Sequence, residues 1–357
     1  MFGSYPTASA QVYKLKNNGN WEAGEIFKDI YQPGMIFLDN DKYLNVVVNS
    51  QTEPVRHYRS IDQKNLNNFK LIASGNGLDD GRSWYVGIGV HDTQIFMAYI
   101  TLDYDLWLTW KNITDSTWHP AILIYDGYSS PKGNHALLYP KFQFKNDTAY
   151  VMTSHTSDGS THNTYDKLFL TKFPVMNPEK LTSEVIFKGD LGYSSFGFDM
   201  IIGKDGTIYC AYSAGDYKYG KQKDNTLHSG LYISVKHYND NKWQQNQIHD
   251  KVGSVALNIS DANELFAVVT EGEWSSENRT FLKKSIDYGS TWTIDENNLF
   301  NSIPNFKHQF FLQTVQENSG SCVTGIDALF SNLHSTKKNA DSLYKFDLGF
   351  LHIDIGN

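Results

Sequence analysis

The sequence predicts an all-β protein, a six-bladed β-propeller built from four-stranded antiparallel blades. The 357 residues include 22 Tyr, 21 Phe, 8 Trp and 27 Gly, a composition typical of strands joined by tight turns. One unit of two apolar strands, a third strand rich in aromatic residues and lysine, and a shorter fourth strand recurs along the chain. Its starts lie roughly 50 to 60 residues apart, a spacing that fits propeller blades.

Each unit begins with an inner pair of strands, which two outer strands follow. The inner pairs of the first three units are 34–38 with 43–48, 84–88 with 94–100, and 139–144 with 149–152. Their outer strands are 55–62 and 69–72, 106–110 and 121–124, and 167–170 and 184–187. Six inner hairpins along the whole chain imply six blades, with seven as the alternative.

The fourth unit contains the clearest hairpin, because Asp205-Gly206 lies between two apolar runs within 198–209. Its outer strands are 231–235 and a segment that starts at Trp243. The fifth unit uses 254–257, 265–269 and 281–283, and the sixth uses 309–312 and 323–326 and lacks a clear fourth strand.

The two ends of the chain are expected to complete the ring. Segments 10–15 and 25–27 resemble outer strands with no inner hairpin before them, and the chain ends with strands at 343–346 and 350–353. Pairing N-terminal with C-terminal strands in one blade would remove the exposed edges of an open array. We therefore expect residues 1–357 to form a single propeller domain.

A tight turn after the third strand of the fifth unit carries the most specific pattern in the chain. Asp287 can accept backbone N–H groups, Gly289 can adopt positive φ, and Trp292 can anchor the outgoing strand. The pattern S-x-D-x-G-x-T-W is formed by Ser285, Asp287, Gly289, Thr291 and Trp292. It resembles the Asp-box, or bacterial neuraminidase repeat, of sialidases and other carbohydrate-active propellers. This resemblance implies a propeller and places the box away from the catalytic face.

Charge and hydropathy exclude two classes of partner. The net charge is −8, and four arginines give no basic face for a phosphate backbone. No apolar run approaches the roughly 20 residues that span a bilayer. The start has no charged segment followed by an apolar one, so a signal peptide is absent or was removed, and removal favours an extracellular or periplasmic location. Cys210 and Cys322 are expected to be buried free thiols.

The tight turn at 285–292 joins the third and fourth strands of its blade. The connections from second to third strands, and those between blades, therefore gather on the opposite face of the propeller. The first candidate site there is the segment 75–85. The guanidinium of Arg82 can hold a carboxylate while the rings of Trp84 and Tyr85 stack on a sugar. The alternative is that both rings pack between blades and Arg82 pairs locally.

The third unit supplies the second candidate site, rich in histidine and tyrosine. His135 and Tyr139 enter its inner strand, and His155, His162 and Tyr165 belong to its connection between second and third strands. These groups could remove a proton α to a uronate carboxylate and protonate the leaving oxygen, while Arg82 or Lys141 neutralises the carboxylate. The arrangement is similar to that of propeller polysaccharide lyases, which implies an anionic carbohydrate ligand.

Other functions remain open at this point. A sialidase is not expected, because Gln32 stands where that family carries an arginine and only four arginines exist. A glycoside hydrolase of sialidase-like fold without the arginine triad is one alternative, and a non-catalytic sugar-binding propeller with one site is another. No cofactor is expected, with structural calcium as the one candidate ion. His155 and His162 lack a third ligand at metal-binding spacing.

Overall fold

A computed structural model of the chain describes nineteen segments, and every regular element within them is a strand. The described residues are 8–16, 20–30, 32–50, 52–63, 65–79, 81–83, 85–101, 103, 105–127, 135–156, 165–192, 198–214, 230–251, 253–260, 262–271, 280–294, 309–314, 325–334 and 345–354.

Within these segments the strands form seven antiparallel sheets, each with its strands in sequence order. A two-stranded sheet contains β1 (Ala8–Leu15) and β2 (Trp21–Ile30). The next two sheets contain β3 (Gln32–Leu38), β4 (Leu44–Asn49), β5 (Arg56–Ser60) and β6 (Phe69–Ser74), then β7 (Tyr85–His91), β8 (Gln94–Ile100), β9 (Leu106–Asn112) and β10 (Ile122–Tyr125).

Three more four-stranded sheets and a three-stranded sheet complete the described part. They contain β11 (His135–Lys145), β12 (Thr148–Thr156), β13 (Tyr165–Pro174) and β14 (Thr182–Gly192); β15 (Asp199–Ile202), β16 (Ile208–Ala214), β17 (Gly230–Lys236) and β18 (Gln244–His249); β19 (Gly253–Ile259), β20 (Leu265–Glu271), β21 (Thr280–Ser285) and β22 (Thr293–Ile294); and β23 (Gln309–Thr314), β24 (Gly325–His334) and β25 (Lys345–Asp354).

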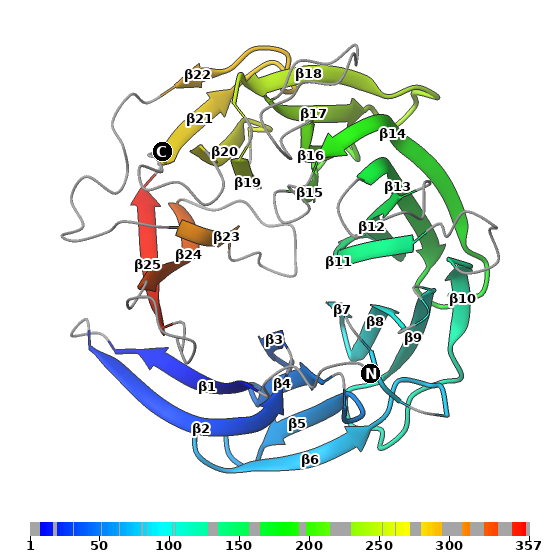
Figure 1. The fold of residues 1–357 in the computed structure, drawn as a ribbon, viewed down its shortest axis with the longest axis vertical. Helices are drawn as coiled ribbons and strands as arrows, with labels where there is room; N and C mark the ends of the chain where they lie inside the picture. The colour runs from blue at the N-terminus through cyan, green and yellow to red at the C-terminus, as the bar shows by residue number, and fades with distance from the viewer. Residues whose placement is uncertain are drawn as a thin grey trace, which may run out of the picture.

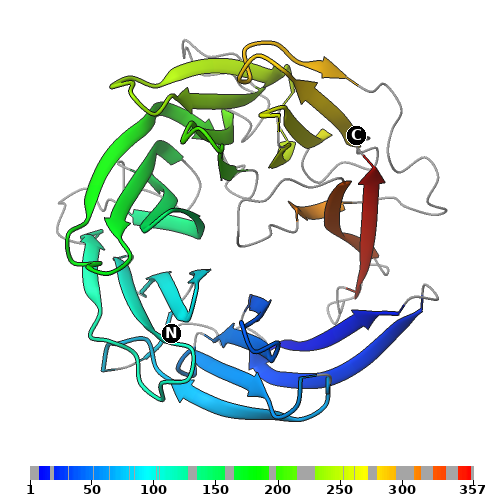
Figure 2. The same ribbon diagram turned by 180° about the vertical axis from the view of Figure 1, so that it is seen from behind.

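The sheets are arranged around a ring, with the first strand of each four-stranded sheet toward the centre and the fourth at the rim (Figure 1). Seen from behind, the same ring places β1 and β2 between β25 and the β3–β6 sheet (Figure 2). The six sheets from β3 to β25 correspond to the six predicted units, except that the single strand β25 replaces the two strands predicted at 343–346 and 350–353.

The N-terminal strands pair with each other and pack on the first four-stranded sheet. Val12, Phe27 and Ile30 lie against Val46 and Val48 in one buried cluster. Among the described strands, β25 pairs with β24 and β1 pairs with β2. Closure of the ring by pairing of terminal strands, and with it the number of blades, therefore stays a prediction.

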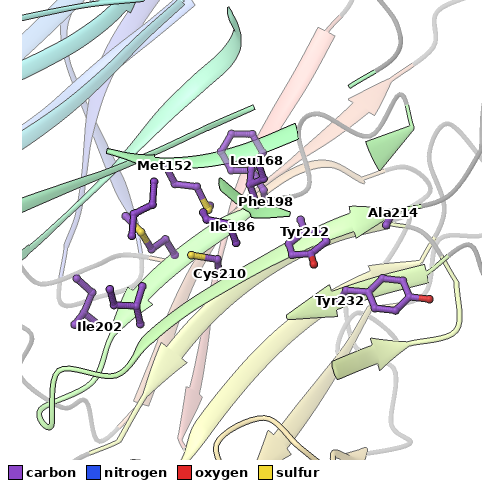
Figure 3. Packing of buried hydrophobic residues seen from close by; sticks show 12 residues of the cluster. Met152, Leu168, Ile186, Phe198, Ile202, Cys210, Tyr212, Ala214 and Tyr232 are labelled. Carbon is purple, nitrogen blue, oxygen red and sulfur yellow. The ribbon is translucent and has the colours of Figure 1, made fainter. Parts of the chain in front are cut away.

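The core lies between neighbouring sheets. Successive side chains of a strand point to opposite faces of its sheet, and apolar residues on both faces let each sheet pack against the sheet on either side. Figure 3 shows one such layer, in which Met152 and Leu168 of the β11–β14 sheet meet Cys210 and Phe198 from the β15–β18 sheet and its approach. Cys210 is a buried free thiol, as predicted, and Cys322 lies outside the described residues.

Two glycines allow the inner strands β7 and β11 to approach closely. A Cβ atom on Gly87 would lie 2.6 Å from the backbone carbonyl carbon of Pro140 and 2.7 Å from its Cβ. A Cβ on Gly89 would lie 2.8 Å from the Cβ of Phe142. The absence of a side chain at these positions therefore sets the spacing between the second and third four-stranded sheets.

The 285–292 corner is held by side chains, as the sequence predicts. Asp287 accepts hydrogen bonds from the backbone N–H of Thr291 (2.9 Å) and from the hydroxyls of Thr291 (2.7 Å) and Ser285 (2.8 Å). These bonds, led by the backbone one, lower the pKa of Asp287 to about 2. Gly289 has φ of 81°, and Trp292 Nε1 donates to its carbonyl oxygen at 3.0 Å.

Two other corners reach a comparable geometry with a lysine in place of Ser285. Lys111 is opposite Ile95 and Lys236 is opposite Ile208, as Ser285 is opposite Leu265. Each lysine ammonium lies 5.6 Å from the ring of a tryptophan at the same spacing as Trp292, namely Trp118 and Trp243. Lys111 Nζ also donates to the carbonyl oxygens of residues 112, 113 and 115 at 2.8 to 3.0 Å.

Lys111 makes the stability of the fold depend on pH. Burial lowers its pKa from 10.5 to about 8, although the nearby Asp115 opposes this. Between these two values the unfolded chain holds a proton that the folded chain has released, so the free energy of unfolding rises with pH. From about pH 8 to pH 10.5, we expect the free energy of unfolding of the wild type to rise by roughly 2–3 kcal/mol relative to that of Lys111→Met, as measured by urea denaturation. A difference that does not change with pH would contradict this assignment.

Candidate functional site

The strand registers show which end of each sheet carries the candidate residues. Tyr85 of β7 is opposite Ile100 at the end of β8, and His155 near the end of β12 is opposite Ala136 near the start of β11. The corner lies at the other end of its sheet, because Ser285 is opposite the first residue of β20. Candidate residues and corners therefore occupy opposite ends of the sheets.

Neighbouring sheets present the same end to the same side of the ring. Gly87 packs against Pro140 and Gly89 against Phe142, so β7 and β11 run in the same direction past each other. We call the side with residues 75–85, the start of β11 and the end of β12 the loop face. The side with the 285–292 corner is the corner face.

Asn76 fixes the 75–83 segment on the loop face. Its fully buried side chain donates to the carbonyl oxygen of Arg82 and accepts from the backbone N–H of Leu78, both at 3.0 Å. The hydroxyl of Tyr99 donates to the carbonyl oxygen of Asn76 at 2.8 Å. The backbone of Arg82 is thus positioned by Asn76, which was not predicted as a site residue, although an asparagine between two glycines is a recognisable turn signal.

Tyr85 packs between sheets. Its half-buried ring lies against both the cluster that contains Met152 and the cluster that contains Phe142. This position matches the alternative in which Tyr85 serves inter-blade packing. Trp84, its predicted partner in sugar stacking, lies outside the described residues.

His155 lies within β12, because this strand continues through Thr156, so the prediction that His155 belongs to the following connection is wrong. Its side chain is 2% exposed and packs between Tyr125 and Phe169, with ring centroids 4.1 and 4.3 Å away. Nε2 lies 3.1 Å from the hydroxyl of Thr153. Among the described residues, Nδ1 has no hydrogen-bond partner.

The imidazole of His155 is neutral over the physiological pH range. Burial is the main cause that lowers its pKa to about 3, and the positive charge of Lys167, which is opposite it on β13, adds to the effect. A neutral buried ring with one unpaired nitrogen is costly to keep in a core. It is therefore a candidate for a functional or positioning role, although it is shielded from solvent in this arrangement.

The other histidines and tyrosines of the predicted site are placed by their backbones. His135 begins β11 opposite Thr156, Tyr139 lies within β11 where its register with β12 shifts, and Tyr165 begins β13. All three backbone positions belong to the loop-face half of this sheet. His162 lies outside the described residues.

Asp199 is a buried carboxyl group on an inner strand that was not predicted from the sequence as a site residue. Asp199, at the loop-face end of β15, is 5% exposed and accepts the backbone N–H groups of Met200 (2.9 Å) and Leu257 (2.8 Å). Burial raises the pKa of Asp199, and the charge of Lys141 is the largest opposing influence. Asp199 therefore connects its own strand β15 to the neighbouring inner strand β19.

No group of three or more His, Cys, Asp or Glu side chains within the described residues is arranged to hold a metal ion. The predicted structural calcium stays a prediction. The described part of the chain contains no helix with the length and apolar character needed to cross a membrane.

Comparison with known proteins identifies the class of fold. No protein-family model matches the chain, and no curated protein matches it by sequence. Among solved structures, a PL25 ulvan lyase has a TM-score of 0.60 at 10% identity, over 90% of this chain and 78% of that one. A second polysaccharide lyase has a TM-score of 0.56 at 8% identity, over 95% and 83%.

A third similar structure is an α-L-arabinofuranosidase from Fusarium graminearum, with a TM-score of 0.52 at 11% identity, over 83% of this chain and 87% of that one. Together these likenesses define the class of fold, an all-β assembly of antiparallel sheets arranged as in propellers. At such low identity they define the fold alone.

Proposed function

We propose that the protein cleaves a uronate-containing polysaccharide by a lyase mechanism on the loop face. The observation that carries this proposal is the whole-chain likeness to two polysaccharide lyases. A structure of the PL25 ulvan lyase, at TM-score 0.59, was solved bound to -[GlcA(1-4)Rha3S]-, an oligosaccharide that contains a uronate. The loop-face position of Arg82, together with the half-buried cation Lys141 on β11, supports an anionic ligand here.

In the proposed reaction a base removes the proton α to the uronate carboxylate. The bond from the β-carbon to the glycosidic oxygen breaks, a carbon–carbon double bond forms, and an acid protonates the leaving oxygen. We assign these proton transfers to His135, Tyr139, His162 and Tyr165. Arg82 or Lys141 neutralises the carboxylate, and Trp84 binds the sugar.

His155 has a different role in this proposal. Its ring is enclosed by Tyr125 and Phe169, so it acts as a positioning residue rather than by touching substrate. Through Thr153 it holds the end of β12, from which the chain continues to His162. A misplacement of about 1 Å in such a support can cost about 100-fold in rate.

The reaction class is tested with a panel of uronate-containing polysaccharides, ulvan included. The lyase product is an unsaturated sugar that absorbs near about 235 nm, while a hydrolase produces reducing ends without this absorbance. We expect the absorbance to rise with ulvan or another uronate polymer. Binding without either signal would identify a non-catalytic sugar-binding protein and would end the lyase proposal.

A glycoside hydrolase is the second candidate, favoured by Asp199. A buried carboxyl group with a raised pKa at the loop-face end of an inner strand is suited to general acid catalysis. If the protein is a hydrolase, Asp199→Asn is expected to lower the release of reducing ends by about 100-fold or more. If the protein is a lyase, this variant keeps most of its activity, because the asparagine oxygen can still accept one of the two backbone N–H groups, that of Leu257 or that of Met200.

We also infer that the ring is closed into six blades, with β1 and β2 completing the sheet of β23, β24 and β25. The support is that Val12, Phe27 and Ile30 pack on the first four-stranded sheet as a neighbouring blade does. A disulfide between cysteines introduced into β1 and β25 would form in a six-bladed ring. Separate sheets in a seven-bladed ring would leave these two strands too far apart to be bridged.

A further inference from the structure

The corner face carries a run of aromatic side chains that the lyase mechanism does not use. Tyr238 in the corner of the β15–β18 sheet is 76% exposed. Its ring lies on the β15–β16 turn, where Cδ2 is 2.9 Å from the position of a Cβ on Gly206. Gly206 has φ of 84°, so a glycine meets both the turn geometry and the contact with the ring. Tyr238 is therefore held with one face against backbone and the remainder in solvent.

The neighbouring residue extends this surface toward the next sheet. The His237 ring meets the Tyr288 ring edge to face, with centroids 5.0 Å apart, and His237 Nδ1 lies 3.3 Å from the Thr207 hydroxyl. Tyr288 is 41% exposed.

We call His237, Tyr238 and Tyr288 the tyrosine strip. It crosses two sheets, since His237 and Tyr238 follow β17 and Tyr288 follows β21. Its rings present apolar faces, and its hydroxyl and imidazole groups add hydrogen-bonding edges. This combination matches a sugar ring, which has apolar C–H faces and a rim of hydroxyl groups.

The backbone of Tyr288 gives an independent indication that this side chain is present for a ligand. Its φ is 59°, in the left-handed region that asparagine or glycine occupies more readily than a bulky residue. The neighbouring Gly289, with φ of 81°, shows that the corner itself requires this geometry. At this φ a tyrosine has a less favourable backbone than asparagine would have, and 41% of its surface is still exposed.

We propose that the tyrosine strip is a second carbohydrate-binding site, on the face opposite the catalytic one, which holds a polysaccharide chain by stacking on Tyr238 and Tyr288. This inference rests on the carbohydrate class of the proposed function and extends it. The site would keep the protein on a long polymer between cleavage events and would have little effect on short oligosaccharides.

The test compares the 357-residue protein with two single variants and with their combination, by affinity electrophoresis in gels that contain ulvan or arabinan. Tyr238→Ala removes the more exposed ring, and Tyr288→Asn removes the other while it suits the left-handed backbone. Met176→Ala, a change at an 83% exposed apolar residue outside the strip, is the matched control. We expect the two variants combined to weaken binding to at least one polymer by about tenfold or more, with the control unchanged.

The outcomes separate this inference from the proposed function. Equal binding by wild type and the combined variant, with cleavage of polymer retained, overturns the tyrosine strip and leaves the lyase proposal standing. Equal weakening by the Met176→Ala control also overturns the strip. A wild type that neither binds nor cleaves any polysaccharide overturns both. Thermal unfolding of Tyr288→Asn at or above the wild-type temperature is expected and shows that lost binding is not lost folding.

Discussion

His155→Ala is expected to lower the rate of polysaccharide cleavage by about 100-fold and the free energy of unfolding by about 3–5 kcal/mol. Both effects follow from its position. The ring fills the space between Tyr125 and Phe169, and its Nε2 is paired with Thr153 at the end of β12. The rate is measured by the absorbance of unsaturated product and the stability by urea denaturation.

His155→Phe separates the two effects. Phenylalanine keeps an aromatic ring of similar size between Tyr125 and Phe169, so the free energy of unfolding is expected to change by less than about 1.5 kcal/mol. The hydrogen bond to Thr153 is lost, and cleavage is still expected to slow at least tenfold. A His155→Phe variant with wild-type kcat and KM would show that the imidazole serves packing alone.

Gly87→Ala is expected to produce the second large effect, on both fold and activity. Its Cβ would meet the carbonyl group of Pro140, a backbone obstacle that cannot turn aside. The inner strands β7 and β11 would have to separate, at a cost of about 1–3 kcal/mol or more. Because Tyr139 and Lys141 flank Pro140, cleavage is expected to fall even at temperatures where the variant remains folded.

Gly189→Ala is the matched control for this prediction. A Cβ at that position would also be crowded, at 2.6 Å from Phe187, but the obstacle is the end of a side-chain ring that can shift. We expect this variant to lose less than about 1 kcal/mol and to keep its activity. Equal losses for Gly87→Ala and Gly189→Ala would contradict the role given to the β7–β11 spacing.

Much of the fold could be predicted from the sequence, because propeller strands are short apolar runs and the turns between them carry residues with distinct roles. The Asp205-Gly206 turn is confirmed by the φ of Gly206, and the hydrogen bonds of Asp287 follow the predicted corner. The arrangement of the chain ends was less accessible. Edge pairing depends on contacts between distant segments, which local patterns do not specify.

Only part of the candidate site could be predicted from the sequence. The sequence predicted which segments gather on the loop face, because antiparallel strand order decides this. It did not predict that His155 would be buried, although Val151, Thr153 and His155 alternate toward one neighbouring sheet as a strand requires. The role of Asp199 was missed because its partner Leu257 belongs to another sheet, and a charged residue beside an apolar run gives no local indication of its partner.

The two corners that carry Lys111 and Lys236 affect how well a repeat can be detected from sequence. Lys111 with Trp118 and Lys236 with Trp243 occupy the place of a serine–tryptophan pair whose network depends on Asp287. An ammonium group over an indole, supported by main-chain oxygens in one corner and by Glu184 in the other, replaces a carboxylate-centred network. Corners at equivalent positions can therefore use different residues to hold the same tryptophan, so the number of matching sequence motifs underestimates how regular the architecture is.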